Sequence, residues 1–154
     1  MKTHLFEITT VWTGAKEQGT TSYTTYDRNF DMQAPGKEVL HCSTDPAFRG
    51  EADKYNPEDM LVGALSSCHM LWYFHLCADA GVIVLAYTDH ATGNMTSGPD
   101  GGKFTSVQLN PIIKVADESM ISAAIALHEA AHKKCFIANS VNFPVECNPQ
   151  ITVI

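Results

Sequence analysis

The chain has 154 residues, of which 45% are hydrophobic and 18% are charged, a balance typical of one globular domain rather than a disordered or fibrous chain. Its formal net charge is −7, with 10 Lys and Arg against 17 Asp and Glu, and no basic block is present. Lysine and arginine contacts to phosphates supply most of the affinity for nucleic acids, so an acidic chain without a basic stripe is a poor nucleic-acid binder. We therefore expect a single domain over residues 1–154 that binds neither nucleic acid nor an anionic membrane surface.

The first residues and the cysteines both indicate a reducing compartment. Residues 1–7 lack the apolar run of a secretory signal peptide, and Glu7 falls where that run would lie. The five cysteines are odd in number and scattered along the chain, which argues against a framework of structural disulfides. We expect a cytoplasmic protein in which any cysteine pairing is redox chemistry.

The N-terminal third has the pattern of β-strands. Residues 4–12 and 20–30 are rich in β-branched and aromatic types and are separated by turn glycines, which predicts a β-hairpin. A short apolar run at 39–42 predicts a third strand. A long loop marked by prolines and a glycine follows it.

The next segment predicts a long helix. Asn56 is a good N-cap, Pro57 suits the first helical position, and Gly81 is a suitable C-terminal stop. Residues 61–78 carry no Asp, Glu, Lys or Arg. Although this approaches the length of a membrane span, the soluble-type start and the polar residues within it predict a buried core helix. Apolar residues lie on all its faces, so we expect a second subunit to help cover it. The strongest predicted stripe consists of Leu61, Leu65, Cys68, Leu71, Trp72, His75 and Leu76.

The remaining elements complete a mixed fold. Strands are predicted near 82–94 and 103–115 around a glycine-rich turn at 97–102. A second helix is predicted at 117–134, a short helical turn at 136–141, and a last strand at 150–154. Helices and hairpins that alternate in blocks predict an α+β fold with antiparallel sheet.

One motif has the spacing of a zinc site. His128, Glu129 and His132 match H-E-x-x-H, which on a helix places two imidazoles one turn apart with a glutamate as general base. A catalytic zinc needs a third ligand, and no histidine follows His132. A solvated helix face is the favoured interpretation, with a zinc hydrolase as the alternative.

The chain contains two arginines, Arg28 and Arg49. Arginine keeps its charge when it is desolvated and can hold a carboxylate with two parallel hydrogen bonds. Taken alone, each arginine is expected to be structural.

Residues 56–71, NPEDMLVGALSSCHML, resemble the signature helix of the OsmC/Ohr family, the osmotically inducible and organic hydroperoxide resistance proteins. The family has Asn-Pro-Glu, then small and apolar residues, then a cysteine ten positions after the glutamate, and Glu58 and Cys68 keep this spacing. The second family cysteine matches Cys135. The resemblance extends over nearly the whole chain, and the segments 45–50 and 135–140 are closer to an OsmC-like branch than to a typical Ohr.

The resemblance implies a thiol-dependent peroxidase whose antiparallel sheets wrap two central helices in an intertwined homodimer. In such a protein Cys68 would be the peroxidatic nucleophile and Cys135 the resolving thiol. An arginine would steady the thiolate, and Glu58 would hold that arginine. Arg49, just ahead of the helix, is the favoured arginine, and Arg28 is the alternative.

The resemblance also implies the partners of the reaction. An organic hydroperoxide would oxidise Cys68 to a sulfenic acid, which would condense with Cys135 to a disulfide that a dithiol reduces. An apolar pocket would favour alkyl or lipid hydroperoxides, and neither a cofactor nor a metal is expected. The residues expected to line this pocket are Leu61, Leu65, Met70, Trp72 and Phe136.

Helix geometry adds one expectation about the subunits. Ten helical residues span about 15 Å, so one arginine side chain does not reach from Glu58 to the Cys68 of the same helix unless its backbone lies between them. We therefore expect Arg49 or Glu58 to reach the site from the other subunit. A further alternative for the whole chain is a catalytically idle relative that binds a small apolar ligand.

Overall fold

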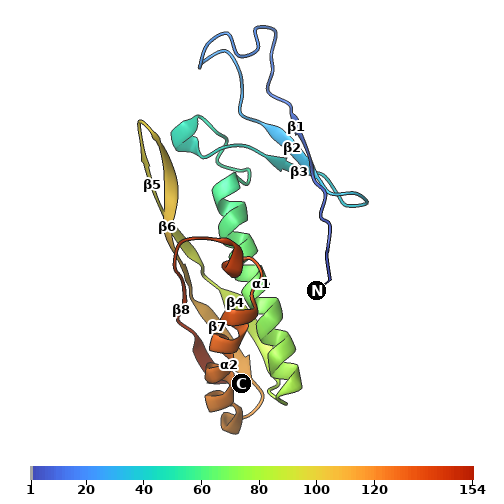
Figure 1. The fold of residues 1–154 in the computed structure, drawn as a ribbon, viewed down its shortest axis with the longest axis vertical. Helices are drawn as coiled ribbons and strands as arrows, with labels where there is room; N and C mark the ends of the chain where they lie inside the picture. Colours follow the sequence, from blue (N-terminus) through green and yellow to red (C-terminus); the bar gives the residue numbers. More distant parts are fainter. Residues whose placement is uncertain (1) are drawn as a thin grey trace. The chain divides into compact units, whose positions relative to one another are not determined.

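The computed structural model describes residues 2–154, which form two compact units, residues up to Met60 and residues from Leu61 onward (Figure 1). Each unit is described by itself. The predicted single domain over 1–154 stays a prediction.

The first unit contains a three-stranded antiparallel sheet in the order β1-β2-β3. Its strands are β1 (Thr9–Trp12), β2 (Phe30–Gln33) and β3 (Leu40–Cys42), followed by the 3₁₀ helix η1 (Pro46–Phe48). The predicted pairing of the first two strands is confirmed by the register Thr9↔Gln33 to Trp12↔Phe30. The third strand is confirmed as well.

The extent predicted for the first two strands is wrong. Residues 4–8 form no strand, and most of the predicted strand at 20–30 is turn and irregular chain. Short polar side chains explain the second difference: the Thr25 hydroxyl donates to the Gly19 carbonyl at 2.7 Å, and the backbone N–H of Ser22 donates to that hydroxyl at 3.1 Å. Such local hydrogen bonds compete with a strand ladder.

Helix α1 (Pro57–Asp79) begins and ends as the sequence predicts. The Asn56 Oδ1 accepts the backbone N–H of Asp59 at 2.8 Å, and the Asp59 carboxylate accepts the N–H of Asn56 at 3.4 Å, so each residue satisfies a free donor of the first turn. Gly81 has φ +72°, the left-handed conformation that terminates many helices.

The face that α1 buries differs from the predicted stripe. The buried side chains are Leu65, His69, Tyr73 and Cys77, each four residues from the next, whereas Leu71 is 62% exposed. Helix α1 is long and apolar enough to cross a membrane, with a mean hydropathy of 1.2 over an 18-residue window. Core helices of soluble proteins can have the same length and hydropathy. Only 22% of that window is buried within the chain.

Two mixed sheets complete the second unit, in the orders β4-β7-β9 and β5-β6-β8. The pairs β4·β7 and β5·β6 are antiparallel, and β8 and β9 add in parallel to β6 and β7. The strands are β4 (Val84–Asp89), β5 (Thr92–Gly98), β6 (Gly101–Leu109), β7 (Pro111–Val115), β8 (Val145–Cys147) and β9 (Gln150–Val153).

The two long strands predicted in this region are four shorter ones. Asn110 separates β6 from β7: its N–H donates to the Asp89 carboxylate at 2.7 Å, and its side-chain amide donates to the His90 carbonyl at 3.0 Å. These bonds link the residue between β6 and β7 to the end of β4 and the residue that follows it. The turn at 97–102 and the strand at 150–154 are confirmed, while β8 was not predicted.

Helix α2 (Ile121–Lys134) is preceded by η2 (Glu118–Met120), and the Asp117 carboxylate caps this start by accepting the Ser119 N–H at 2.8 Å. Cys135 ends α2, and η3 (Ala138–Ser140) follows within the predicted 136–141 turn.

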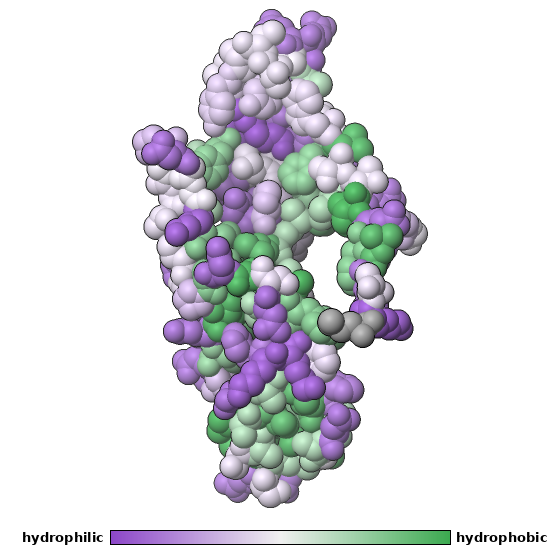
Figure 2. Space-filling view, in the orientation of Figure 1, coloured by the Kyte–Doolittle hydropathy of each residue, from purple (hydrophilic) through white to green (hydrophobic). Residues whose placement is uncertain are grey.

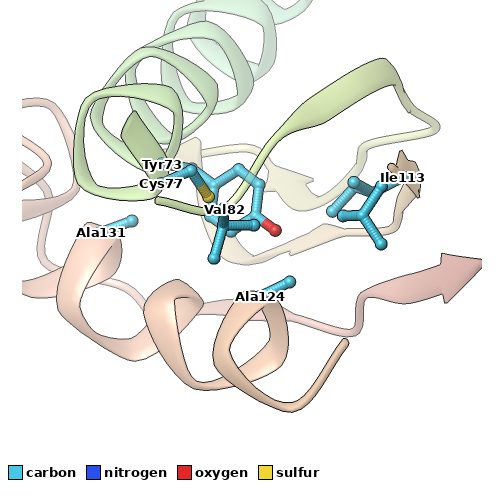
Figure 3. Packing of buried hydrophobic residues seen from close by; sticks show 7 residues of the cluster. Tyr73, Cys77, Val82, Ile113, Ala124 and Ala131 are labelled. Carbon is cyan, nitrogen blue, oxygen red and sulfur yellow. The ribbon is translucent and has the colours of Figure 1, made fainter. Parts of the chain in front are cut away.

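The main core of the second unit lies between α1, α2 and the β4-β7-β9 sheet (Figure 3). Tyr73 and Cys77 of α1 and Ala124 and Ala131 of α2 belong to this core cluster. A second cluster joins Leu65 to Val107 and Leu109 of β6. The predicted α+β class with two central helices is therefore confirmed.

Candidate active site

The structure brings together the two cysteines that the sequence singled out. Cys68 lies on α1 and is partly buried, and Cys135, at the end of α2, is 1% exposed. Burial, together with the neighbouring Cys68 side chain, raises the pKa of the Cys135 thiol from its ordinary 9.0 to about 11. Both are free thiols, so the pair is in its reduced form.

The turn after α2 holds the Cys135 sulfur in place. The N–H of Ala138, in η3, donates to the Cys135 Sγ at 3.4 Å, and the Cys135 carbonyl accepts the Asn139 N–H at 3.0 Å. Hydrogen bonds to a sulfur favour its thiolate form and offset part of the effect of burial. Cys135 therefore keeps its proton at neutral pH. The hydrogen bonds of the turn hold its backbone in place.

The two arginines are in the first unit and are held differently. The Arg28 guanidinium donates to the carbonyls of Tyr23 and Tyr26, both at 2.6 Å, and lies 4.3 and 4.1 Å from their ring centroids. Arg49 follows η1 at φ 70°, and its guanidinium is 5.9 Å from the Tyr23 ring centroid. Within residues 2–154 the Arg49 side chain makes no hydrogen bond, so its donors are available to a carboxylate or thiolate.

Glu58, in the first turn of α1, has one carboxylate oxygen that is buried without a partner among the described residues. A buried unpaired carboxylate oxygen is costly, and a guanidinium is the group that best satisfies it.

The residues predicted to line a substrate pocket have different surroundings. Leu65 is fully buried in the second core cluster, with Leu61 packed at its edge. The rings of Trp72 and Phe136 meet edge to face at 5.5 Å, and Phe136 is 68% exposed. Met70 is partly buried. An apolar substrate pocket from these five residues stays a prediction.

The three residues of the H-E-x-x-H motif differ in burial along α2. His128 is buried, whereas His132 is exposed and Glu129 is bound to Lys133 at 2.6 Å. Within residues 2–154, the one group of side chains close enough to hold a metal ion is His69, His128 and Cys147, without Glu129 or His132. The interpretation of His128 as part of a solvated face is wrong, and the zinc-hydrolase ligands do not converge.

His69 and Cys147 were missed as functional candidates. A histidine on an apolar helix face is most often a core residue, and Cys147 has no motif around it, so neither residue stands out in the sequence. The spacing of Leu65, His69 and Tyr73, four residues apart, could have placed His69 inward.

Comparison with known proteins finds a family model and similar solved structures. Residues 50–150 match the family model described as OsmC-like protein. The structure is similar to an OsmC-like protein of unknown function from Vibrio cholerae, with 27% identity, 96% of this chain and 100% of that chain covered, and a TM-score of 0.86. No curated protein matches the chain.

Two organic hydroperoxide resistance proteins share the fold. The protein from Elizabethkingia anophelis has 19% identity and a TM-score of 0.72, with 100% of each chain covered. The protein from Legionella pneumophila, described as an OsmC, has 16% identity and a TM-score of 0.71, with 99% of each chain covered. With the family model matching about two thirds of its length, the chain belongs to the OsmC-like protein family.

Proposed function

We propose that the protein is a thiol peroxidase that reduces organic hydroperoxides. The observation that carries the proposal is the contact between the Cys68 and Cys135 thiols, which come from two helices of the second unit. A peroxidatic thiol needs a second thiol within bonding reach once it is oxidised, and this pair supplies it.

The proposed reduction of a hydroperoxide has three steps. The Cys68 thiolate attacks the outer peroxide oxygen, so that an S–O bond forms, the O–O bond breaks, and the alkoxide takes a proton and leaves as an alcohol. The Cys135 sulfur then attacks the sulfenic sulfur of Cys68; the S–S bond forms, and the S–O bond breaks with release of water. A dithiol reduces the disulfide by two thiol exchanges and is itself oxidised to a disulfide.

Arg49 and Glu58 are assigned to the first step. A free cysteine is only a few per cent thiolate at pH 7, and a fixed positive charge beside the sulfur raises that fraction. Arg49 has unused donors, and Glu58 has an unpaired buried oxygen that a guanidinium would satisfy. Arg28 is the weaker candidate because two carbonyls already hold it.

The proposal includes an intertwined homodimer. Hydrophobic surface, green in Figure 2, gathers at the end of the second unit where α1 ends. Several large apolar side chains of this unit are half exposed or more, namely Leu71, Ile83, Leu85 and Ile125. Large exposed apolar patches are typical of protein interfaces.

The five free cysteines fit a reducing compartment, and we extend the proposal to the cytoplasm.

Intact-mass measurement tests the redox pair directly. The reduced protein is treated with one equivalent of cumene hydroperoxide, and the expected product has lost two hydrogens and yields a Cys68–Cys135 peptide. C135S should instead gain one oxygen, and the matched control C42S, changed at another buried cysteine, should behave as wild type. An unchanged mass, or a disulfide that does not contain Cys68, would contradict the proposal.

A further inference from the structure

A second cluster of reactive side chains lies in the second unit, apart from the Cys68–Cys135 pair. His69 of α1, His128 of α2 and Cys147 of β8 each place one ligand atom within 4.8 Å of the other two. The His69 Nε2 is 2.9 Å from the His128 Nδ1, and the Cys147 Sγ is 3.6 Å from each of these nitrogens.

We propose that His69, His128 and Cys147 form a binding site for one zinc ion. With Zn–N and Zn–S bonds of about 2.05 and 2.3 Å, the edges of a tetrahedron are about 3.3 Å between two nitrogens and about 3.6 Å between nitrogen and sulfur. The two nitrogen–sulfur distances already equal that edge. Metal binding replaces the hydrogen bond between the two rings: the nitrogen–nitrogen distance has to open from 2.9 Å by a few tenths of an ångström, and both rings have to rotate so that their lone pairs point at the ion instead of at each other.

The three ligand atoms have the chemistry of a zinc site. Two imidazole nitrogens and one thiolate suit zinc, whereas magnesium and calcium require oxygen ligands. His69 is 1% exposed and His128 is 5% exposed, and this burial lowers the pKa of both imidazoles to about 4. Both rings are therefore neutral at physiological pH.

A carboxylate near the three ligands can offset the positive charge of the bound ion. Binding converts the Cys147 thiol to a thiolate and releases one proton, so zinc with two neutral histidines and one thiolate carries a net charge of +1. Asp89 acts electrostatically on both His69 and Cys147. Its carboxylate is fixed by the Ser66 hydroxyl and by the Asn110 N–H, at 2.5 and 2.7 Å.

The site has an open side. His128 and Cys147 also line a cavity of about 340 Å³, together with the motif residues Glu129 and His132. A metal ion can enter from this cavity, and a water molecule or another small ligand can complete the fourth coordination position there.

Cobalt titration of the metal-free, full-length protein tests the proposal, because Co²⁺ replaces zinc and gives a thiolate-to-metal absorption band. One Co²⁺ per chain, with tetrahedral d–d bands and displacement by ZnCl₂, is expected. H69A, H128A and C147S should each lose the thiolate band, while H132A and C42S, which change a neighbouring exposed histidine and a distant buried cysteine, should keep it.

Alkylation of Cys147 is a second readout that needs no variant. In the wild-type protein, zinc should slow the reaction of Cys147 with N-ethylmaleimide at least tenfold and leave that of Cys42 unchanged. The inference is overturned if Co²⁺ gives no thiolate band, if C147S keeps the band, or if zinc does not protect Cys147. Neither readout depends on peroxidase activity, so the site and the proposed function can fail separately.

Discussion

The buried thiol of Cys135 at the end of α2 lies beside the Cys68 side chain in α1, and this neighbour helps to raise the pKa of Cys135. If Cys68 is oxidised as we propose, Cys135 is the neighbouring thiol that can react with it. Burial holds the pKa of Cys135 high, so this thiol is protonated at neutral pH.

The first prediction concerns the resolving step. C135S should complete one turnover with an organic hydroperoxide and then stop as a Cys68 sulfenic acid, because no thiol remains to displace the oxygen. Trapping with dimedone, followed by mass spectrometry, measures this species. With excess peroxide the variant should pass on to the sulfinic acid, whereas wild type should stay at the disulfide. A disulfide between Cys68 and another cysteine in C135S, formed without added thiol, would mean that Cys135 is not the resolving thiol.

The second prediction distinguishes the arginines. R49A should slow the reaction of Cys68 with peroxide about 10- to 100-fold at neutral pH, because it removes the fixed positive charge that we propose stabilises the attacking sulfur. R28A should instead destabilise the protein by about 1–2 kcal/mol, because it removes two hydrogen bonds and two ring contacts. Stopped-flow kinetics and urea unfolding separate the two effects. The opposite pattern would assign the role to Arg28.

Elements with local signals were predictable from the sequence. The start of α1 follows from Asn56 and Pro57, whose capping chemistry depends only on neighbouring residues, and its end follows from Gly81. The helical turn predicted at 136–141 contains η3.

Features that depend on tertiary contacts were not predictable. Strand β8 is three residues long and forms by parallel pairing with β6, which no local pattern encodes. The buried face of α1 was misplaced because an apolar residue occupies nearly every position, so periodicity could not choose a side. His69 and Cys147 meet only because β8 lies beside the helices, so their cluster was missed.

The third prediction tests the cap of α1. N56A should lower the free energy of unfolding by about 1 kcal/mol, because it removes the acceptor for the Asp59 N–H. N56D, which keeps an acceptor oxygen, should recover most of the loss. Urea midpoints at constant m-value measure both, and an N56A midpoint equal to wild type would show that the cap contributes nothing.

The fourth prediction is a loss of stability at alkaline pH. The pKa of Cys135 is about 11 in the folded chain against an ordinary 9.0, so the folded state binds the proton more tightly. The resulting stabilisation is fully present below pH 9 and is lost as the pH rises from about 9 to about 11. Over that range wild type should lose about 1–2 kcal/mol more than C135S, measured by urea unfolding at each pH. Parallel curves for the two proteins would contradict this.

The fifth prediction asks which subunit supplies the arginine. If Arg49 acts on the Cys68 of the other chain, a dimer of one R49A chain and one C68S chain contains one complete site, although each variant alone has none. Equal amounts mixed, dissociated and reassociated should therefore recover about a quarter of wild-type activity, since half of the dimers are mixed and each has one working site. A mixture of C68S with C135S serves as a control, because both cysteines of a site come from one chain and no activity should return. Activity of the R49A and C68S mixture no greater than the sum of its parts would place Arg49 beside the Cys68 of its own chain.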